Sequence, residues 1–175
     1  REILCNTGFA HVWLNQGVQS IPVFIKQFRQ RLIDVYNQEW FSTLRDKECY
    51  SVYSFFKFTL LPEPYLSFVD IYCFRVAFTQ IRLHALPLNN NVHRYSEISS
   101  NRNCVTCNRM VEDEKHLIFE CPLYSDLRKR FIGDVIYLPF SCLVKGTDLA
   151  LTQSVAKFVF HSMKRRSAHI CNEIV

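Results

Sequence analysis

The chain has 175 residues, of which 49% are apolar and 21% are charged, so it can fold around one ordinary core and is not a disordered tail. Its four glycines form no G-x-G-x-x-G or Walker sequence, which argues against the phosphate-binding loops of nucleotide-dependent enzymes. The net charge of +5 is a modest basic excess that favours an anionic partner.

The first strong helical signal covers residues 21–44. Apolar residues recur there at helical spacing and predict a long amphipathic helix, with Ser20 as its N-cap and Pro22 in its first turn. The aromatic stretch 50–60 is interpreted as another helix, after which two prolines interrupt the chain.

A second long helix is expected from Tyr65 to about Ala85, with Arg75 and Arg82 on one face. Leu86-Pro87 and the following asparagines end this helix. Residues 93–103 are polar and are expected to form a loop.

Three helical segments are expected in the last third of the chain. Residues 116–121 suggest a short helical turn behind acidic capping residues, and Pro122 starts a new helix. A loop over 133–148 then leads into a last amphipathic helix from Ala150 to about Arg166.

The pattern Cys104-x2-Cys107-x8-His116-x4-Cys121 is the feature that specifies chemistry. Three thiolates and one imidazole at this spacing are the ligand set of a closed tetrahedral zinc site. The intervening residues are mostly polar and acidic and cannot build a core, so a metal would supply folding free energy, on the order of 10 kcal/mol in small zinc modules. We expect one structural Zn²⁺.

A disulfide and a chance pattern are the alternatives to zinc. Cys-x2-Cys is also the spacing of thioredoxin-like redox motifs, but those follow a strand in an α/β pattern that the residues before Cys104 do not have. Chance could place some cysteines at this spacing in a chain that has eight of them. A correctly spaced His-x4-Cys after Cys-x2-Cys favours zinc over both alternatives.

These elements predict a mainly α fold, a helical body with an inserted small CCHC zinc module. The expected segments are 1–100 before the module, 101–124 for the module, and 125–175 for helices that pack back on the body. The remaining cysteines show no pairing pattern and are expected to be buried small hydrophobes; they are Cys5, Cys49, Cys73, Cys142 and Cys171.

The compartment can also be inferred from the sequence. The start, at Arg1 without an initiator Met, has no secretory signal, and the apolar stretch 68–78 is too short to span a bilayer and contains charges. We expect an intracellular protein with no membrane partner, in which free cysteines stay reduced. The missing start suggests a fragment of a longer polypeptide.

Residues 111–124, VEDEKHLIFECPLY, and the following Asp126-Leu127-Arg128 resemble the zinc-knuckle region near the C-terminus of LINE-type (non-LTR) retrotransposon reverse transcriptases. Upstream, residues 63–66 and 75–84 are similar to the helical stretch before that knuckle. Downstream, residues 155–160 look like the short helix that ends many such polyproteins. The resemblance covers about residues 26–166.

The resemblance implies a non-catalytic segment that binds template RNA or target DNA during target-primed reverse transcription, in the nucleus or in a cytoplasmic ribonucleoprotein. The family's polymerase needs an Asp-Asp pair for magnesium, and this chain has none. We therefore expect no enzymatic activity and no small-molecule substrate. The expected partners are nucleic acid and the remainder of the parent polypeptide.

Basic and aromatic residues near the knuckle are the candidate nucleic-acid contacts. Arginines could reach phosphates, and Tyr95 or Tyr124 could stack on an unpaired base, although core packing is the alternative for both tyrosines. The candidates are Arg94, Tyr95, Arg102, Arg109, Tyr124, Arg128, Lys129 and Arg130.

Two further functions are compatible with the sequence. The zinc module could instead clamp a polar loop to the body, which would dock on the polymerase or endonuclease of the same polypeptide. A catalytic zinc is the third possibility, but catalytic sites usually keep a position open for water, whereas four protein ligands are present here. The histidines outside the pattern are expected to have ordinary surface or core roles.

Overall fold

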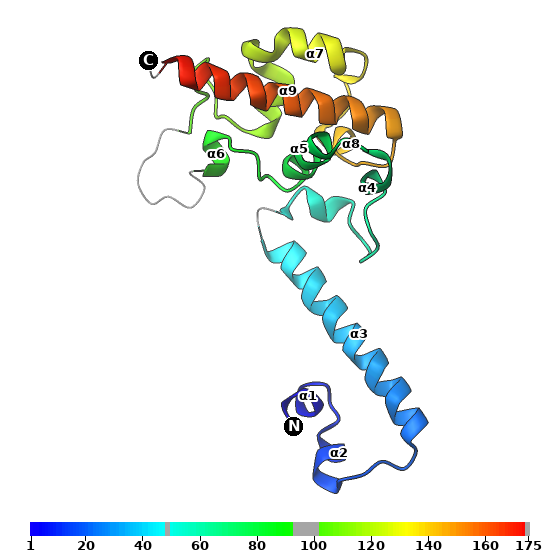
Figure 1. Cartoon of the computed structure of the whole chain (residues 1–175). Helices are drawn as coiled ribbons and strands as arrows, with labels where there is room; N and C mark the ends of the chain where they lie inside the picture. Colours follow the sequence, from blue (N-terminus) through cyan, green and yellow to red (C-terminus); the bar gives the residue numbers. More distant parts are fainter. Residues whose placement is uncertain (48–49, 93–101, 174–175) are drawn as a thin grey trace. The chain divides into compact units, whose positions relative to one another are not determined.

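The computed structural model describes residues 1–47, 50–92 and 102–173. The protein is mainly helical, as expected, and its described residues contain no β-strand, only an isolated antiparallel bridge between Asn103 and Val111 (Figure 1). The chain divides into two compact units, Arg1–Glu48 and Cys49–Val175. The segment boundaries expected near residues 100 and 124 stay a prediction.

The N-terminal unit consists of α1 (Glu2–Asn6), α2 (Ala10–Asn15) and the long α3 (Ile21–Asp46). Helix α3 confirms the first predicted helix: Ser20 is at the N-cap position, and its carbonyl accepts a hydrogen bond from the Phe24 N–H at 3.0 Å. The Phe9 ring packs edge-on against Phe24 and Phe28, with centroids 5.6 and 5.5 Å apart. Among the described residues of this unit, only Thr7 and Leu44 are fully buried.

The C-terminal unit contains ten helical segments in its described residues, most of them short. In chain order they are η2 (Tyr53–Phe55), α4 (Tyr65–Phe68), α5 (Tyr72–Arg82), α6 (Asn89–Val92), η3 (His116–Glu120), η4 (Pro122–Tyr124), α7 (Ser125–Phe131), η5 (Gly133–Val135), α8 (Phe140–Leu143) and α9 (Leu149–Glu173). The turn at His116 and the helical start at Pro122 are confirmed. No helix of the described residues is long and apolar enough to cross a membrane.

Several predicted elements differ from the structure. The helix expected over 50–60 is wrong: only the 3-10 turn η2 forms there. The helix expected over 65–85 is interrupted between α4 and α5, where the Arg75 Nε donates to the Val69 carbonyl at 2.8 Å. The loop expected over 133–148 contains η5 and α8, and α9 runs seven residues beyond Arg166, to Glu173.

Helices α5 and α9 form the centre of the C-terminal unit, with α7 on the other side of α9 (Figure 1). Phe78 and Ile81 of α5 and Phe158 of α9 are completely buried and belong to one hydrophobic cluster. Burial of each such side chain contributes about 1.5–3 kcal/mol to folding. The same cluster includes Cys104 and Cys121, so two predicted metal ligands lie in the core.

Arg82 of α5 is buried, with 1% of its surface exposed, in a cage of aromatic rings. Its guanidinium donates to Glu63 at 2.7 Å, and Glu63 also pairs with Lys57 at 2.6 Å. Burial raises the pKa of Glu63, but the hydrogen bonds from Lys57 and Arg82 outweigh burial and hold it below the ordinary value. Four rings lie within 4.5–5.7 Å of the guanidinium carbon: Tyr53, Phe56, Tyr65 and Phe78. Two rings of the aromatic stretch 50–60, those of Tyr53 and Phe56, therefore pack on a buried cation.

Replacement of Arg82 by Lys should lower the free energy of unfolding by about 2 kcal/mol, because an ammonium cannot stack its plane on the rings as the guanidinium does. Urea unfolding followed by circular dichroism measures the loss. Arg130→Lys, the same substitution at an exposed position, should change stability by less than about 0.5 kcal/mol. Equal effects of the two substitutions would contradict a special role for the cage.

Candidate metal centre

The first two predicted ligands lie on a tight turn within residues 102–121, which we call the ligand loop. The Cys104 N–H donates to the Met110 carbonyl at 2.8 Å, and the Asn108 N–H donates to the Cys104 carbonyl at 2.9 Å. Asn108, directly after Cys107, has φ of 50°, a left-handed conformation that asparagine tolerates better than most residues. This turn brings the Cys104 and Cys107 side chains to the same side of the loop.

The other two predicted ligands lie on and after η3. Asp113 starts this segment, since its carboxylate accepts a hydrogen bond from the His116 N–H at 2.8 Å. The backbone of η3 has the wide π form, and at its end the Cys121 N–H donates to the His116 carbonyl at 2.9 Å. The acidic cap expected before His116 is therefore present.

Three of these four side chains converge in space, and Cys121 is not part of that group. One ligand atom from each of Cys104, Cys107 and His116 lies within 4.8 Å of the others, so the group could hold a metal ion. The Cys107 Sγ is 3.4 Å from the His116 Nε2. The Cys104 Sγ is also 3.7 Å from the Cys121 Sγ.

The pKa values of two of the thiols are shifted in opposite directions. Burial raises the pKa of Cys121 to about 12, whereas the backbone N–H of Arg109 lowers the pKa of the more exposed Cys107. Without a cation, the buried thiol therefore stays protonated at neutral pH. A bound cation favours thiolates, so metal binding would release protons here.

His116 is oriented by a carboxylate. Its Nδ1 lies 3.1 Å from a Glu120 oxygen, which leaves Nε2 directed toward Cys107. Metal-bound histidines usually have such a partner on the second ring nitrogen. The exposed side of this group opens into a cavity of about 480 Å³ that Arg109 and Met110 also line.

Two buried carboxylates attach the ligand loop to the helices. Glu112, 2% exposed, accepts from Arg166 of α9 through both oxygens, at 2.8 and 2.7 Å, and from the Asn89 N–H at 2.8 Å. Glu114 accepts from Asn91 at 2.6 Å and contacts the His84 ring at 2.9 Å. Burial raises the pKa of Glu114, but the hydrogen bond and charge of His84 outweigh it, so the pKa lies below its ordinary value.

The predicted nucleic-acid contacts are divided between surface and interior. Arg94 and Tyr95 lie outside the described residues. Arg128 is half-buried, and its guanidinium donates to the Ile118 and Cys121 carbonyls, so it holds η3 in place. Tyr124 is 2% exposed, which corresponds to the core-packing alternative and leaves no ring face for a base. The exposed candidates are Arg102, Arg109, Lys129 and Arg130.

Two features were missed from the sequence. Glu112 and Glu114, which belong to the acidic residues expected to cap the turn at His116, are buried anchors whose partners are distant in the chain. The five cysteines outside the pattern were expected to be buried. This prediction is wrong for four of them, and Cys49 lies outside the described residues. The exposed ones are Cys5, Cys142 and Cys171, and the half-buried one is Cys73.

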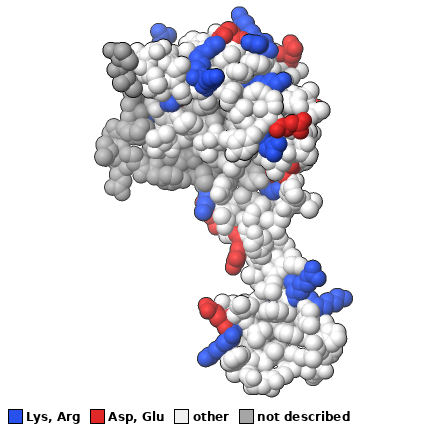
Figure 2. Space-filling model, in the orientation of Figure 1, with Lys and Arg blue, Asp and Glu red and all other residues white. Residues whose placement is uncertain are grey.

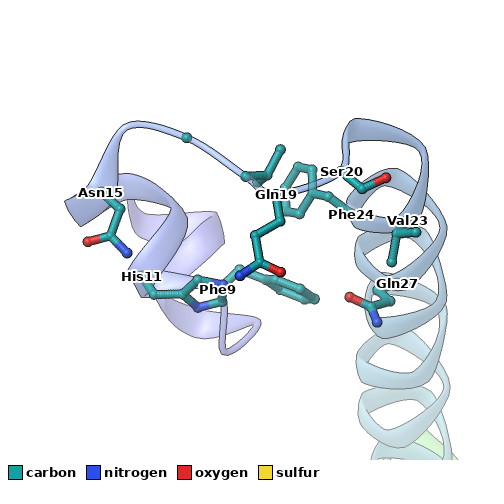
Figure 3. Close-up of a pocket in the computed structure, with 10 residues that line it drawn as sticks. Phe9, His11, Asn15, Gln19, Ser20, Val23, Phe24 and Gln27 are labelled. Atoms are coloured by element: carbon teal, nitrogen blue, oxygen red, sulfur yellow. The ribbon is translucent and has the colours of Figure 1, made fainter.

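A second hollow lies in the N-terminal unit, between α2 and the start of α3 (Figure 3). Its volume is about 550 Å³. Its lining contains His11, two phenylalanines and several amides but no carboxylate, lysine or arginine. This lining offers neither a metal site nor a binding surface for phosphates.

Comparisons of the chain with protein-family models, curated proteins and solved structures find no match. Function must therefore be inferred from the residues themselves.

Replacement of Arg166 by Met should lower the free energy of unfolding of the C-terminal unit by about 3–5 kcal/mol, since Glu112 would be left buried without its cation. Arg165→Met is the matched control. Arg165 pairs with the exposed Asp126, and a surface ion pair contributes about 1 kcal/mol or less. Denaturant unfolding of both variants measures the difference, and an equal loss would mean that the buried pair does not anchor the loop.

Proposed function

We propose that the protein is a non-catalytic nucleic-acid-binding module whose C-terminal unit is held together by one structural Zn²⁺. The observation that carries the proposal is the convergence of Cys104, Cys107 and His116, with Cys121 beside Cys104. In the proposed zinc site all four side chains are ligands.

The distances among the ligand atoms support zinc. In a tetrahedral site with Zn–S bonds of about 2.3 Å, two sulfurs are about 3.8 Å apart, and a sulfur and a nitrogen are about 3.5 Å apart. The corresponding separations are 3.7 Å between Cys104 and Cys121 and 3.4 Å between Cys107 and His116. These two of the six ligand pairs have the spacing of tetrahedral coordination, whereas Cys121 lies outside the group whose ligand atoms are all within 4.8 Å of one another.

The surroundings support a structural role for the ion. Cys104, Cys121 and His116 are buried at 2%, 0% and 4% exposure, and four protein ligands leave no position for a substrate. When bound, zinc would supply a stable cross-link between the turn at Cys104 and the end of η3. Glu120 would hold the His116 ring, and the Arg109 N–H would stabilise the Cys107 thiolate.

Nucleic acid is the proposed partner because of the exposed cations. Arg109 follows Cys107 on the ligand loop, and Lys129 and Arg130 end α7. No ion pair within the described parts of the chain involves these three residues. Figure 2 shows Lys and Arg side chains gathered over the part of the C-terminal unit where Figure 1 draws α7. Such groups suit phosphates.

The resemblance to LINE-type reverse transcriptases supplies the proposed setting. In that setting the module would contact template RNA or target DNA during target-primed reverse transcription, as part of a longer, intracellular polypeptide. The partner macromolecule would then be held through its phosphates, with the zinc-organised loop keeping Arg109 in a fixed position.

Docking on another protein is the second candidate function, and the N-terminal unit favours it. Many large apolar side chains of this unit are 40–76% exposed, far more than a unit with its own core would show. They are Ile3, Trp13, Leu14, Ile21, Val23, Ile25, Leu32, Ile33 and Tyr36.

The double variant Cys104→Ser/Cys107→Ser should bind no zinc and should lose the structure of residues 103–124, because the loop would lack its cross-link. Elemental analysis of the purified protein measures zinc per chain, and amide hydrogen exchange measures the local unfolding. Cys142→Ser/Cys171→Ser replaces two exposed cysteines and should keep one zinc. Retention of zinc by the first variant would refute the assignment.

The zinc-loaded chain should bind single-stranded RNA or duplex DNA with an affinity that falls as salt rises, by about 0.7–0.9 log units per phosphate contact for each log unit of salt. Fluorescence anisotropy across a salt series, with and without a zinc chelator, measures this dependence. Binding should decrease on chelation. Absence of binding by the zinc-loaded chain would exclude the nucleic-acid function and favour protein docking.

A further inference from the structure

Two aromatic rings are stacked where α7 meets α9. The Phe131 ring, at the end of α7, lies parallel to the His161 ring of α9, with centroids 5.3 Å apart and an interplanar angle of 4°. The Arg130 guanidinium also lies over the Phe131 ring, 5.2 Å from its centroid. Phe74 of α5 and Phe160 of α9 complete the surroundings of His161. The stack therefore holds one guanidinium and one imidazole in a fixed arrangement.

Positive charge is concentrated around this stack. Lys164, one helical turn after His161 on α9, is exposed, as is Arg130. Burial first, and then the charges of Arg130 and Lys164, hold the pKa of His161 below its ordinary value. The nearest acidic group on α7, Asp126, is already paired through both oxygens with Arg165. Arg130 and Lys164 therefore make the surface beside His161 positive, and neither of them is in an ion pair within the described parts of the chain.

We propose that Arg130, His161 and Lys164 form a phosphate-binding site for the backbone of a single-stranded nucleic acid. The site rests on the proposed nucleic-acid function and extends its contact surface from Arg130 of α7 to His161 and Lys164 of α9. Arg130 and Lys164 neutralise a phosphodiester, and His161 donates a hydrogen bond to the same group.

A bound phosphate changes the protonation of His161. An anion beside the ring favours the imidazolium and raises the pKa of His161. Since the free protein holds this pKa low, binding takes up a proton, and affinity rises as the pH falls. Each unit by which the phosphate raises the pKa corresponds to a tenfold gain in affinity at low pH.

We assign a single strand to this site rather than a duplex. The site offers side chains at a helix–helix junction, which suits a flexible backbone that can bend toward them. Duplex DNA and single-stranded RNA are therefore compared as probes. Preference of the site for the duplex would overturn this part of the inference.

The test uses the full zinc-loaded chain and a labelled single-stranded RNA oligonucleotide. Arg130→Gln/Lys164→Gln should weaken binding about 10-fold or more at low salt and should reduce the slope of log K against log salt by about 0.7 for each lost contact. Lys26→Gln/Arg29→Gln removes the same charge from exposed positions of α3 and is the matched control. It should leave the slope unchanged.

His161→Phe tests the histidine without removing the ring stack. Wild type should bind more tightly at about pH 5.5 than at about pH 7.5, and the variant should lose most of that gain. An unchanged pH dependence would overturn the role of His161. If Arg130→Gln/Lys164→Gln binds the RNA as tightly as wild type and with the same salt slope, this site alone is overturned. If wild type itself does not bind the RNA, the proposed function is overturned together with the site.

Discussion

The buried contact between Glu112 and Arg166 is the constraint on which the C-terminal unit depends. Residues 102–121 carry too few apolar side chains to fold by themselves, yet Cys104 and Cys121 lie in the hydrophobic cluster. A carboxylate bound through both oxygens to a guanidinium of α9 holds the loop against that cluster. Because an unpaired charge would be costly at this depth, the loop has one favourable position.

The ion pair lies near the proposed metal site, with Tyr124 close to both. Burial is the largest cause of the raised pKa of Tyr124. The charges of Cys121, Glu112 and Cys104, which lie close to its hydroxyl, raise this pKa further. The ligand atoms and the ion pair therefore belong to one buried polar region. Loss of either would admit water to that region and weaken the other, so zinc removal should unfold more than the loop's own few residues.

Sequence reasoning succeeded where the information was local. The spacing of apolar residues predicts α3, and ligand spacing predicts the group formed by Cys104, Cys107 and His116. It failed where a distant partner decides the outcome. In the stretch 50–60, Tyr53 and Phe56 pack on the distant Arg82 and no long helix forms. Glu112 pairs with Arg166, which lies 54 residues further along the chain. No periodic pattern in the sequence predicts either contact.

The arginines show why net charge is a poor measure of a binding surface. Arg82, Arg128, Arg165 and Arg166 are all engaged within the protein, with carboxylates, carbonyls or rings. The basic runs at 128–130 and 164–166 thus contain both structural cations and exposed ones. The exposed members, Lys129, Arg130 and Lys164, lie on two helices that Asp126 and Arg165 join. The phosphate contacts made there would consequently be few and fixed in geometry. Such contacts place a strand at a defined position on the protein, whereas a large basic surface attracts nucleic acids strongly without a preferred position.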